Sequence, residues 1–275
     1  MKRKKSPVRF VMSLWILAGC LSLGGCDMID YHPYDVQIKG ETDVNARNIA
    51  EIEAACKYKE VIRFVTMGDS QRWYDETEDF VEAVNRRDDI DFVIHGGDMS
   101  DFGVTDEFMW QRDIMNGLNV PYVALLGNHD CLGTGEETFN KIFGNPNFSF
   151  IAGRIRFVCL NTNAIEYDYS RPIPDFQFME ACMTTRREEF DRTIVSMHIQ
   201  PLSEEFNNNV ARVFERYVTE MPGILFCTSA HGHRNATEDI FGDGMLYYMS
   251  TCMKDRNYNL FTVHQNEYTH EIISY

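Results

Sequence analysis

The amino-acid sequence predicts a layered α/β domain. From residue 61 onwards, short apolar runs that are typical of buried strands alternate with amphipathic stretches of helical length. The last three apolar runs follow one another without a helix between them, which indicates antiparallel pairing and hence a mixed sheet. With 275 residues, of which 44% are hydrophobic and 13% aromatic, the chain can bury one substantial core.

The elements follow in a regular order. In residues 45–56, Ile49, Ile52 and Ala55 recur at helical spacing. The expected elements of the first half are then a strand at 61–67, a helix at 76–87, a strand at 90–97, a helix at 106–118 and a strand at 120–127. Further strands are expected at 154–161, 193–198, 224–231, 245–251 and 260–265. The last two, with the segment 270–275, are expected to run antiparallel.

The N-terminal region has the features of a bacterial lipoprotein signal. Residues 1–25 hold five basic side chains followed by an apolar run, and small residues precede Cys26. Cys20 fits the same pattern, but the apolar run continues past it, so Cys26 is the favoured lipidation site. A transmembrane helix is the alternative, although the run is shorter than the roughly 18 to 20 residues of a span. Residues 26–45 then form a tether that leads into one domain at 46–275.

The charge of the chain argues against a nucleic-acid partner. The formal net charge is -16, and removal of residues 1–25, which hold five basic and no acidic residues, brings it to -21. Such a surface repels polyanions, and an anionic substrate would need a local positive charge such as a metal.

The cysteine pattern favours buried thiols over a disulfide framework. Six cysteines remain if Cys20 and Cys26 are set aside, none of them forms a C-x-x-C pair, and Cys159 and Cys227 lie within apolar runs. Export would permit one bridge, with its pairing left open.

Five predicted strands end at residues that can hold a metal or a phosphate. In α/β sheets ligands gather at the carboxyl ends of the strands, so these residues should converge. One Asp after a glycine is usually a turn residue, but five such endings together are not explained by turns. A mixed set of Asp, Asn and His indicates a transition metal, and two ions would need a shared carboxylate, for which Asp98 is the candidate. The endings are Gly68-Asp69, Gly97-Asp98, Gly127-Asn128-His129-Asp130, Met197-His198 and Ala230-His231-Gly232-His233.

The blocks "GDSQ", "GGDMSD", "GNHD", "SMH" and "AHGH" resemble, in order and approximate spacing, the motifs of the calcineurin-like metallophosphoesterase superfamily. The resemblance covers about residues 61–275. It implies a four-layer α/β/β/α sandwich of two mixed sheets flanked by helices. It also implies hydrolysis of a phosphate ester by a metal-bridging hydroxide at a dinuclear site containing Mn, Fe or Zn.

The resemblance also implies a role for each residue of the blocks. Asp69 and His233 would hold the first metal, and Asp98 would bridge both ions. His129 would protonate the leaving oxygen or steady the charge on the phosphoryl group, and Asp130 would orient its ring. The remaining ligands of the second metal would be Asn128, His198 and His231.

The chain departs from the family pattern at two positions. Gln71 stands where the first block usually has histidine, and its amide oxygen is a weaker donor than imidazole. Gln71 is expected to be a ligand beside Asp69, the alternative being a bystander next to a weak or empty first site. Ala230 replaces the glycine of the last block, which is a minor change.

The sequence therefore predicts an exported, lipid-anchored metallophosphoesterase that acts on a small phosphorylated substrate. Monoester, diester and nucleotide substrates stay open, as do the membrane face and the oligomeric state. Arg72 and Arg234 are candidates for binding the substrate phosphate, with a solvated rim as the alternative. His95 is expected to be a hydrogen-bonded core residue and Cys131 a spectator thiol. The rival function is a non-catalytic metal-binding or ligand-binding lipoprotein on the same scaffold.

Overall fold

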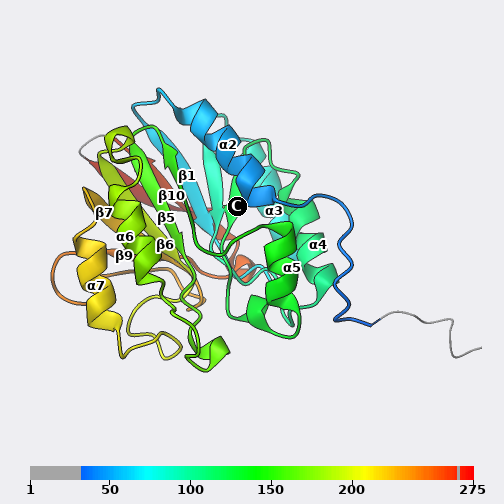
Figure 1. Ribbon diagram of the computed structural model, residues 1–275. Coiled ribbons are helices and arrows are strands. Elements are labelled where there is room, and N and C mark those ends of the chain that lie inside the picture. The colour runs from blue at the N-terminus through cyan, green and yellow to red at the C-terminus, as the bar shows by residue number, and fades with distance from the viewer. Residues whose placement is uncertain (1–31, 265–266) are drawn as a thin grey trace, which may run out of the picture.

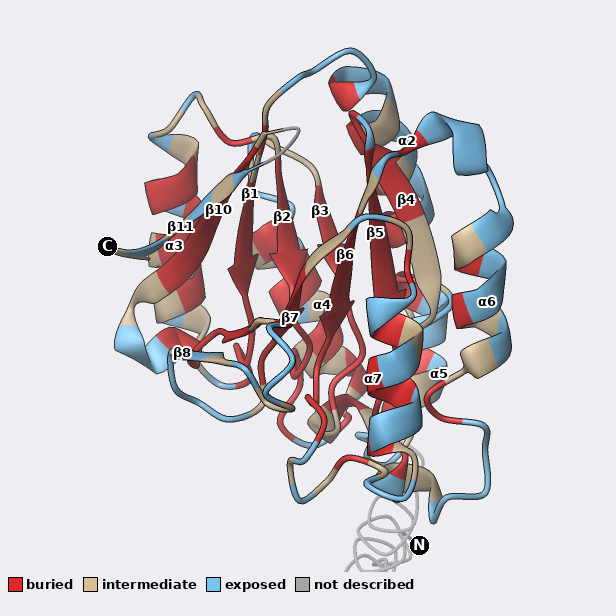
Figure 2. Cartoon of the chain, turned by 90° about the vertical axis from the view of Figure 1, so that its left-hand side faces the viewer, coloured by how far each residue is buried: buried red, intermediate tan, exposed pale blue. Residues whose placement is uncertain are grey.

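The computed structural model describes residues 32–264 and 267–275, and it contains two β-sheets packed face to face with helices on both outer faces (Figure 1; Figure 2). The α/β/β/α sandwich expected from the resemblance is confirmed. The predicted lipoprotein signal, with Cys20 and Cys26, lies outside the described residues. In the part of the chain that is described, no helix is both long and apolar enough to span a bilayer.

The first sheet has the strand order β11-β10-β1-β2-β3. Its three parallel members are neighbours, and β10 adds antiparallel to β1 and to β11. The bounds are β1 Ile62–Met67, β2 Phe92–His95, β3 Tyr122–Ala124, β10 Asn257–Val263 and β11 Tyr268–Ser274. The three parallel strands agree with the segments predicted from apolar runs.

The second sheet has the order β4-β5-β6-β7-β9-β8. Strands β5, β6, β7 and β9 are parallel, whereas β4 and β8 are antiparallel edge strands. The bounds are β4 Phe148–Ala152, β5 Ile155–Leu160, β6 Arg192–Met197, β7 Ile224–Ser229, β8 Ala236–Glu238 and β9 Tyr247–Met249. The strands β4 and β8 were not predicted.

The expected pairing of the last three apolar runs is correct in part. Strands β10 and β11 form the predicted antiparallel pair. Strand β9, however, lies in the other sheet and runs parallel to β7. The chain between β9 and β10, which includes the short helix η4 (Met253–Asp255), crosses from one sheet to the other. Two consecutive strands without an α-helix between them are therefore not neighbours here.

The helices divide between the two outer faces. Helices α3, α4 and α5 pack on the first sheet, and α6 and α7 pack on the second. Helix α2 contacts β3 and β4 and so closes the edge where the two sheets meet. The bounds are α2 Val44–Cys56, α3 Tyr74–Asn85, α4 Thr105–Met115, α5 Gly135–Ile142, α6 Phe176–Thr184 and α7 Ala211–Thr219. Of these, α2, α3 and α4 were predicted.

An aromatic core holds the two sheets together. Phe64 on β1 is fully buried and lies against Phe92 and Phe261 of its own sheet and Phe157 of the facing sheet, with ring centroids 5.0–5.5 Å apart. Its neighbour Val65 points to the opposite face and packs beneath the helices, as the period of two along a strand requires. Each buried phenylalanine contributes about 2 to 3 kcal/mol to folding. The sheets therefore form one rigid scaffold.

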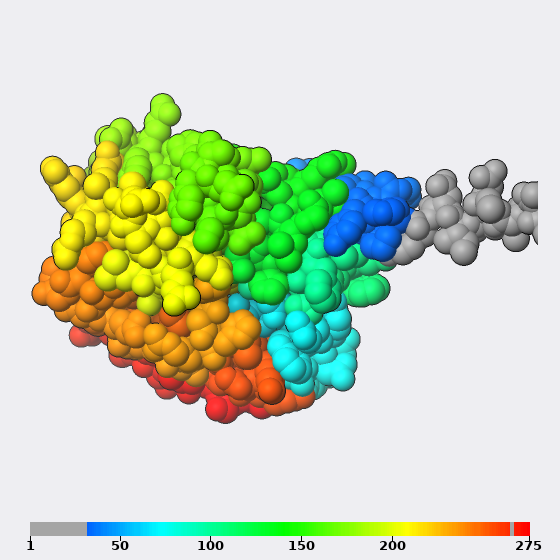
Figure 3. Space-filling model, turned by 90° about the horizontal axis from the view of Figure 1, so that it is seen from below, coloured from blue at the N-terminus to red at the C-terminus, as the bar shows by residue number. Residues whose placement is uncertain are grey.

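The parallel strands of both sheets end at the same edge of the sandwich, which is the lower edge in Figure 2. Figure 3 views the molecule from below, onto this edge, where the yellow and orange segments of the second sheet meet the cyan and green segments of the first. The loops that follow the parallel strands are therefore brought together from both sheets.

Candidate metal centre

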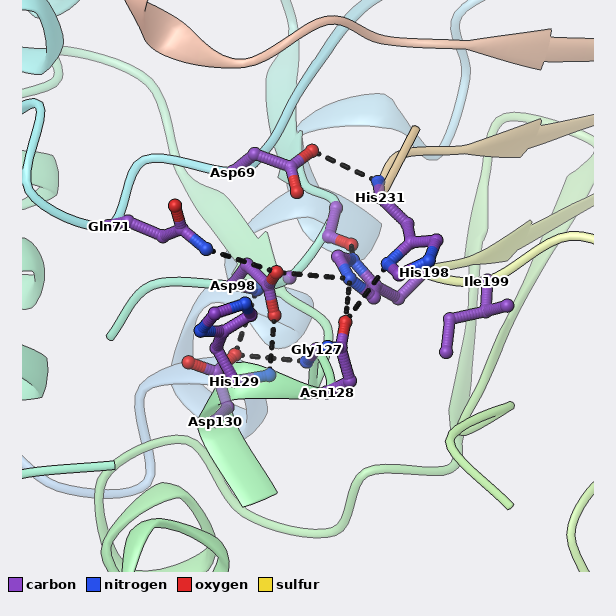
Figure 4. Close-up of polar contacts among 12 residues, drawn as sticks. Asp69, Gln71, Asp98, Gly127, Asn128, His129, Asp130, His198, Ile199 and His231 are labelled. Atoms are coloured by element: carbon purple, nitrogen blue, oxygen red, sulfur yellow. Dashed lines mark hydrogen bonds and ion pairs between the residues drawn. The ribbon is translucent and has the colours of Figure 1, made fainter. Parts of the chain in front are cut away.

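The strand endings that were predicted to carry ligands converge at this edge (Figure 4). Asp69, Asp98 and Asn128 follow β1, β2 and β3 of the first sheet. His198 and His231 follow β6 and β7 of the second sheet. The site therefore lies between the two sheets and depends on both.

One group of side chains is arranged as a set of ligands. Single ligand atoms of Asp98, His198 and His231 all lie within 4.8 Å of one another. The Oδ1 atom of Asn128 lies 3.0 Å from Nε2 of His198 and 3.0 Å from Nδ1 of His231. The other ring nitrogen of His198, Nδ1, is 2.8 Å from the carbonyl oxygen of Gly96, which leaves Nε2 for the centre. These four side chains are the predicted ligands of the second metal.

A second group lies on the other side of Asp98. Oδ1 of Asp69 is buried and has no hydrogen-bond partner among the described residues, and it lies 3.2 Å from Nε2 of His233. The other oxygen, Oδ2, accepts the backbone N–H of His231 at 3.0 Å. A buried carboxylate oxygen without a partner is costly unless a cation binds there. Oxygen and imidazole donors together suit a transition metal, so the residues present fit the implied ions.

Gln71 lies at the centre, as predicted, but its amide nitrogen faces Asp98. The side chain is buried, and Nε2 lies 3.4 Å from Oδ2 of Asp98. The backbone carbonyl of Gln71 accepts a hydrogen bond from Gln111 on α4 at 2.9 Å, which fixes the turn. In this orientation Gln71 donates to the carboxylate of Asp98, and its role as a metal ligand stays a prediction.

The backbone around the centre is strained. Asp69, Gln71, Asp98, His231 and His233 all have positive φ angles, between 34° and 68°. Such conformations cost of order 1 kcal/mol or more per residue outside glycine, and they cluster at functional sites.

Glycine is required where the loops of the first sheet approach each other. A Cβ atom on Gly127 would lie 2.1 Å from Oδ1 of Asp98. Gly97 has a φ of +103°, and a Cβ atom there would lie 2.8 Å from Nδ1 of His198. Both glycines of the strand endings thus make room for a ligand.

The ligand histidines differ in electrostatic environment. Burial lowers the pKa of His198, but the nearby carboxylate of Asp98 outweighs burial and raises it to about 10. Burial and the charge of His198 lower the pKa of His231. Because a metal and a proton compete for the same ring nitrogen, an ion that bound here would displace the proton on Nε2 of His198.

The predicted orientation of His129 by Asp130 is wrong. Nδ1 of His129 lies 2.9 Å from the backbone carbonyl oxygen of Asp101, and its backbone N–H donates to Oδ1 of Asp98 at 2.9 Å. The Asp130 carboxylate is fully used by backbone N–H groups beneath Asp98, where burial and the charge of Asp98 raise its pKa to about 6. His129 lies beside the Asp98 carboxylate, and a backbone carbonyl rather than Asp130 holds its ring.

The two candidate phosphate-binding arginines are each paired with a carboxylate. Arg72 contacts Asp101 at 2.6 Å, with 60% of its side chain exposed. Arg234 contacts Glu238 at 2.8 Å, with 54% exposed. The assignment of both to substrate binding stays a prediction.

Two other predictions concern nearby side chains. His95 is buried, lies 2.8 Å from Oγ of Ser70 and accepts the backbone N–H of Gly97, which confirms it as a hydrogen-bonded core residue. Burial raises the pKa of the Cys131 thiol, as expected of a spectator. The six cysteines of the described residues are all free, as the preference for thiols predicted.

Two residues that contact histidines of the centre were not singled out from the sequence. Asp101 lies in the "GGDMSD" block, three residues after Asp98, so its position offered a clue. Glu205 belongs to no motif and approaches His231 from a loop. The same loop lines a cleft of about 740 Å³ beside the centre, whose walls include Gln200, Leu202, Glu204, Glu205, His231 and Arg234.

One curated relative is similar to part of the chain. The chain is 28% identical over 134 residues to a 3',5'-cyclic-nucleotide phosphodiesterase of Nostoc sp.. The match covers 46% of this chain and 49% of the relative, so the chain spans about half the length of the curated relative it matches.

Solved structures share the fold at low sequence identity. The purple acid phosphatase PPD1 of yellow lupin superposes with a TM-score of 0.59 at 15% identity, covering 79% of this chain and 52% of that one. TT1561 of Thermus thermophilus superposes with a TM-score of 0.55 at 12% identity, and the match covers 77% of this chain and 98% of that one. GAP50 of Plasmodium, the anchor in the inner membrane complex, superposes with a TM-score of 0.56 at 13% identity. The match covers 78% of this chain and 85% of that one.

The family described as Calcineurin-like phosphoesterase matches residues 62–235, which include every block around the centre. That range takes in β1 to β7 and all the predicted ligands, from Asp69 to His233. A match over more than half of the chain, with the ligands in place, establishes that this protein belongs to the calcineurin-like phosphoesterase family.

Proposed function

We propose that the protein is a metal-dependent phosphoesterase that hydrolyses a small phosphate ester at a centre of two transition-metal ions. The observation that carries the proposal is the convergence of Asp98, Asn128, His198 and His231 from two sheets, with His129 beside them. Asp69 and His233 would hold the other ion, with Asp98 shared, and Gln71 completes the predicted set. Mn, Fe and Zn all suit these donors.

The metal ions, when bound, would neutralise phosphate oxygens and lower the pKa of the attacking water. The residues of the chain supply the rest. Oδ1 of Asp98 accepts the backbone N–H of His129, which fixes the carboxylate, and Oδ2 faces Gln71 and His198, where it would meet the ions. Nδ1 of His129 donates to the carbonyl of Asp101. Burial lowers the pKa of the ring, but this hydrogen bond and the nearby Asp98 carboxylate outweigh burial and raise it, so the ring would carry a second proton on Nε2. That proton would pass to the leaving oxygen as the bond between phosphorus and that oxygen breaks.

A phosphodiester is the substrate class that the charge of the chain favours. A diester carries one negative charge, whereas a monoester carries up to two near neutral pH, and the chain has a formal charge of -16. The curated relative is named a 3',5'-cyclic-nucleotide phosphodiesterase, which supports the same choice. The cleft beside His231 offers room for the alcohol part of a diester.

The test is a comparison of hydrolysis and metal content. Bis(p-nitrophenyl) phosphate, p-nitrophenyl phosphate and cyclic nucleotides are offered to the purified protein after reconstitution with Mn, Fe or Zn. We expect about two ions per chain by elemental mass spectrometry and faster turnover of the diesters. His129→Ala should keep its ions and lose about 10² to 10⁴ in kcat. A protein that binds metal but hydrolyses none of these esters would support the rival, a non-catalytic binding protein.

We further infer that the protein is exported and anchored to a membrane by lipid on Cys26. The basic and apolar N-terminal residues with small residues before Cys26 support this location. Labelling with an alkyne fatty acid should mark the wild type and not Cys26→Ser. If the label persists in Cys26→Ser and disappears in Cys20→Ser, Cys20 rather than Cys26 is the lipidated residue.

A further inference from the structure

We propose that Glu205 is a positioning residue that holds the ring of the ligand His231 through its outer nitrogen, Nε2. The inference rests on the proposed metal centre and concerns a residue outside every motif of the family blocks. Oε2 of Glu205 lies 3.6 Å from Nε2 of His231. Among the described residues, this oxygen is buried and has no hydrogen-bond partner.

The two ring nitrogens of His231 face different groups. Nδ1 lies 3.0 Å from Oδ1 of Asn128, within the cluster of ligands. Nε2 points the other way, toward Glu205. A neutral imidazole carries one N–H, and only the nitrogen without it can bind a metal. A carboxylate at Nε2 therefore favours the tautomer that leaves the lone pair of Nδ1 for the ion.

The unpartnered oxygen supplies the driving force for this contact. A buried carboxylate oxygen without a donor is unfavourable, because it has lost its hydration and gained no hydrogen bond in exchange. The distance of 3.6 Å is longer than the roughly 2.7–3.0 Å of a formed bond between these atoms. A sub-ångström approach of the carboxylate to Nε2 would satisfy the oxygen and fix the ring. The backbone of His231 is itself in the left-handed region at a φ of 68°, so the ring gains from a second anchor.

The loop that carries Glu205 is built to keep the carboxylate in place. The adjacent Phe206 is 1% exposed and packs against Phe214 of α7, with ring centroids 5.3 Å apart. Asn208 closes the loop, because its Oδ1 accepts the backbone N–H of Leu202 at 3.0 Å and its Nδ2 donates to the carbonyl of Ser203 at 2.7 Å. Glu205 is thus tied to the second sheet, as His231 is.

Glu204 provides a matched control. It is the preceding residue on the same loop, it carries the same charge, and it lines the same cleft. It is exposed, and within the described part of the chain it forms no ion pair with a histidine. A general effect of negative charge near the centre would appear in both Glu204 and Glu205 variants, whereas a positioning effect appears only in the latter.

The experiment measures zinc binding rather than hydrolysis. Calorimetric titration of the full metal-free chain with Zn²⁺ is compared for wild type, Glu205→Ala, Glu205→Gln and Glu204→Ala, with circular dichroism to verify folding. We expect Glu205→Ala to weaken one of the two zinc sites about 10- to 100-fold, the usual effect of losing the partner of a ligating histidine. Glu205→Gln should lose less, because its amide oxygen still accepts the N–H, and Glu204→Ala should stay within about twofold of wild type.

A second readout is the tautomer of His231 itself. Nitrogen-15 NMR of histidine-labelled, zinc-loaded wild type should show the proton of this ring on Nε2 and the zinc on Nδ1, with assignment from His231→Gln. This spectrum needs no folded Glu205 variant. Zinc affinity of Glu205→Ala equal to wild type, or a proton on Nδ1, would overturn the inference.

The outcomes also separate this inference from the proposed function. A wild type that binds no zinc sinks both. If the wild type binds two ions and hydrolyses esters, and Glu205→Ala binds zinc with wild-type affinity, only the positioning role of Glu205 is contradicted. If Glu205→Ala loses zinc affinity while the metal-loaded wild type cleaves no ester, the positioning role of Glu205 is supported and the proposed esterase activity is contradicted.

Discussion

The buried carboxylate of Asp130 accepts the backbone N–H of Asp98 at 2.9 Å. It also accepts the backbone N–H groups of Met99, Ser100 and Gly127 at 2.8–2.9 Å. One side chain thereby joins the loop after β2 to the loop after β3 and shapes the backbone from which Asp98 projects. The aspartate of the "GNHD" block therefore positions the backbone of Asp98 rather than the ring of His129.

Replacing Asp130 by Asn should destabilise the fold. Asparagine keeps one acceptor oxygen and turns an NH₂ group toward backbone donors, which leaves at least one buried N–H without a partner. We expect the free energy of unfolding to fall by about 2 to 4 kcal/mol in urea denaturation. Asp88→Asn, at an exposed position, should change it by less than about 0.5 kcal/mol. An Asp130→Asn midpoint that matches this control would mean that the four backbone contacts contribute little.

Variants of Gln71 should show whether its side chain binds a metal ion or only donates a hydrogen bond to Asp98. The side chain is buried beside Asp98 with its nitrogen 3.4 Å from Oδ2. If the amide turns its oxygen to the first ion, Gln71→Ala should lower the affinity of that site about 10-fold, the low end of the loss seen when one supporting contact at a metal is removed. Gln71→His should raise it, since imidazole is the stronger donor. Ion content and affinity by elemental analysis and calorimetry provide the measurement. Equal zinc affinity in all three proteins would assign Gln71 to the hydrogen bond with Asp98 alone.

The strand endings were predictable because they combine two local patterns. A buried parallel strand is a short apolar run, and the ligand follows it directly, often after a small residue, as at Gly68-Asp69 and Gly97-Asp98. Neither pattern depends on the rest of the fold. The convergence of the endings then follows from the rule that parallel strands present their carboxyl ends at one edge.

Short elements and contacts between loops were harder to predict. Helix α7 was not predicted, although its sequence has the pattern of an amphipathic helix: Ala211, Phe214 and Val218 recur at helical spacing and are buried. By contrast, the transfer of β9 to the second sheet depends on tertiary pairing with β7. The role of Asp101 at His129 was hidden for a similar reason, since it uses a backbone carbonyl whose direction no side-chain pattern records.

The aromatic core between the sheets predicts a large cost for Phe64→Ala. Phe64 is fully buried and contacts rings of both sheets. Removing the ring leaves a cavity, and we expect a loss of about 3 to 5 kcal/mol in the free energy of unfolding. Phe64→Leu should lose less because it fills part of the space. Both variants should retain wild-type metal content while folded. Loss of metal from folded Phe64→Ala would instead show that β1 has moved Asp69.

Glu215 should make the stability of the protein depend on pH. This carboxyl on α7 is buried, accepts a hydrogen bond from Tyr247 on β9, and faces Asp239 and Asp243 in the loop before β9 and Cys227 on β7. Burial, together with the charges of the two aspartates, raises its pKa from 4.5 to about 7. A folded state that holds the proton more tightly than the unfolded chain is favoured at low pH. The stabilisation is complete below about pH 4.5 and is lost as the pH rises through about 7.

Glu215→Gln, which is neutral at every pH, should remove this dependence. Between pH 5 and pH 8, the free energy of unfolding of wild type should fall relative to Glu215→Gln by on the order of 2 to 3 kcal/mol. Guanidinium denaturation of both proteins at several pH values measures the difference. Glu220→Gln serves as the control, since Glu220 lies at the exposed end of the same helix in an ion pair with Arg216. Exposed pairs of this kind contribute about 0 to 1 kcal/mol, so its curve should follow that of wild type. If wild type and Glu215→Gln instead run parallel across this range, Glu215 is already ionised in the folded protein at pH 5, and the carboxylates around it do not hold its proton.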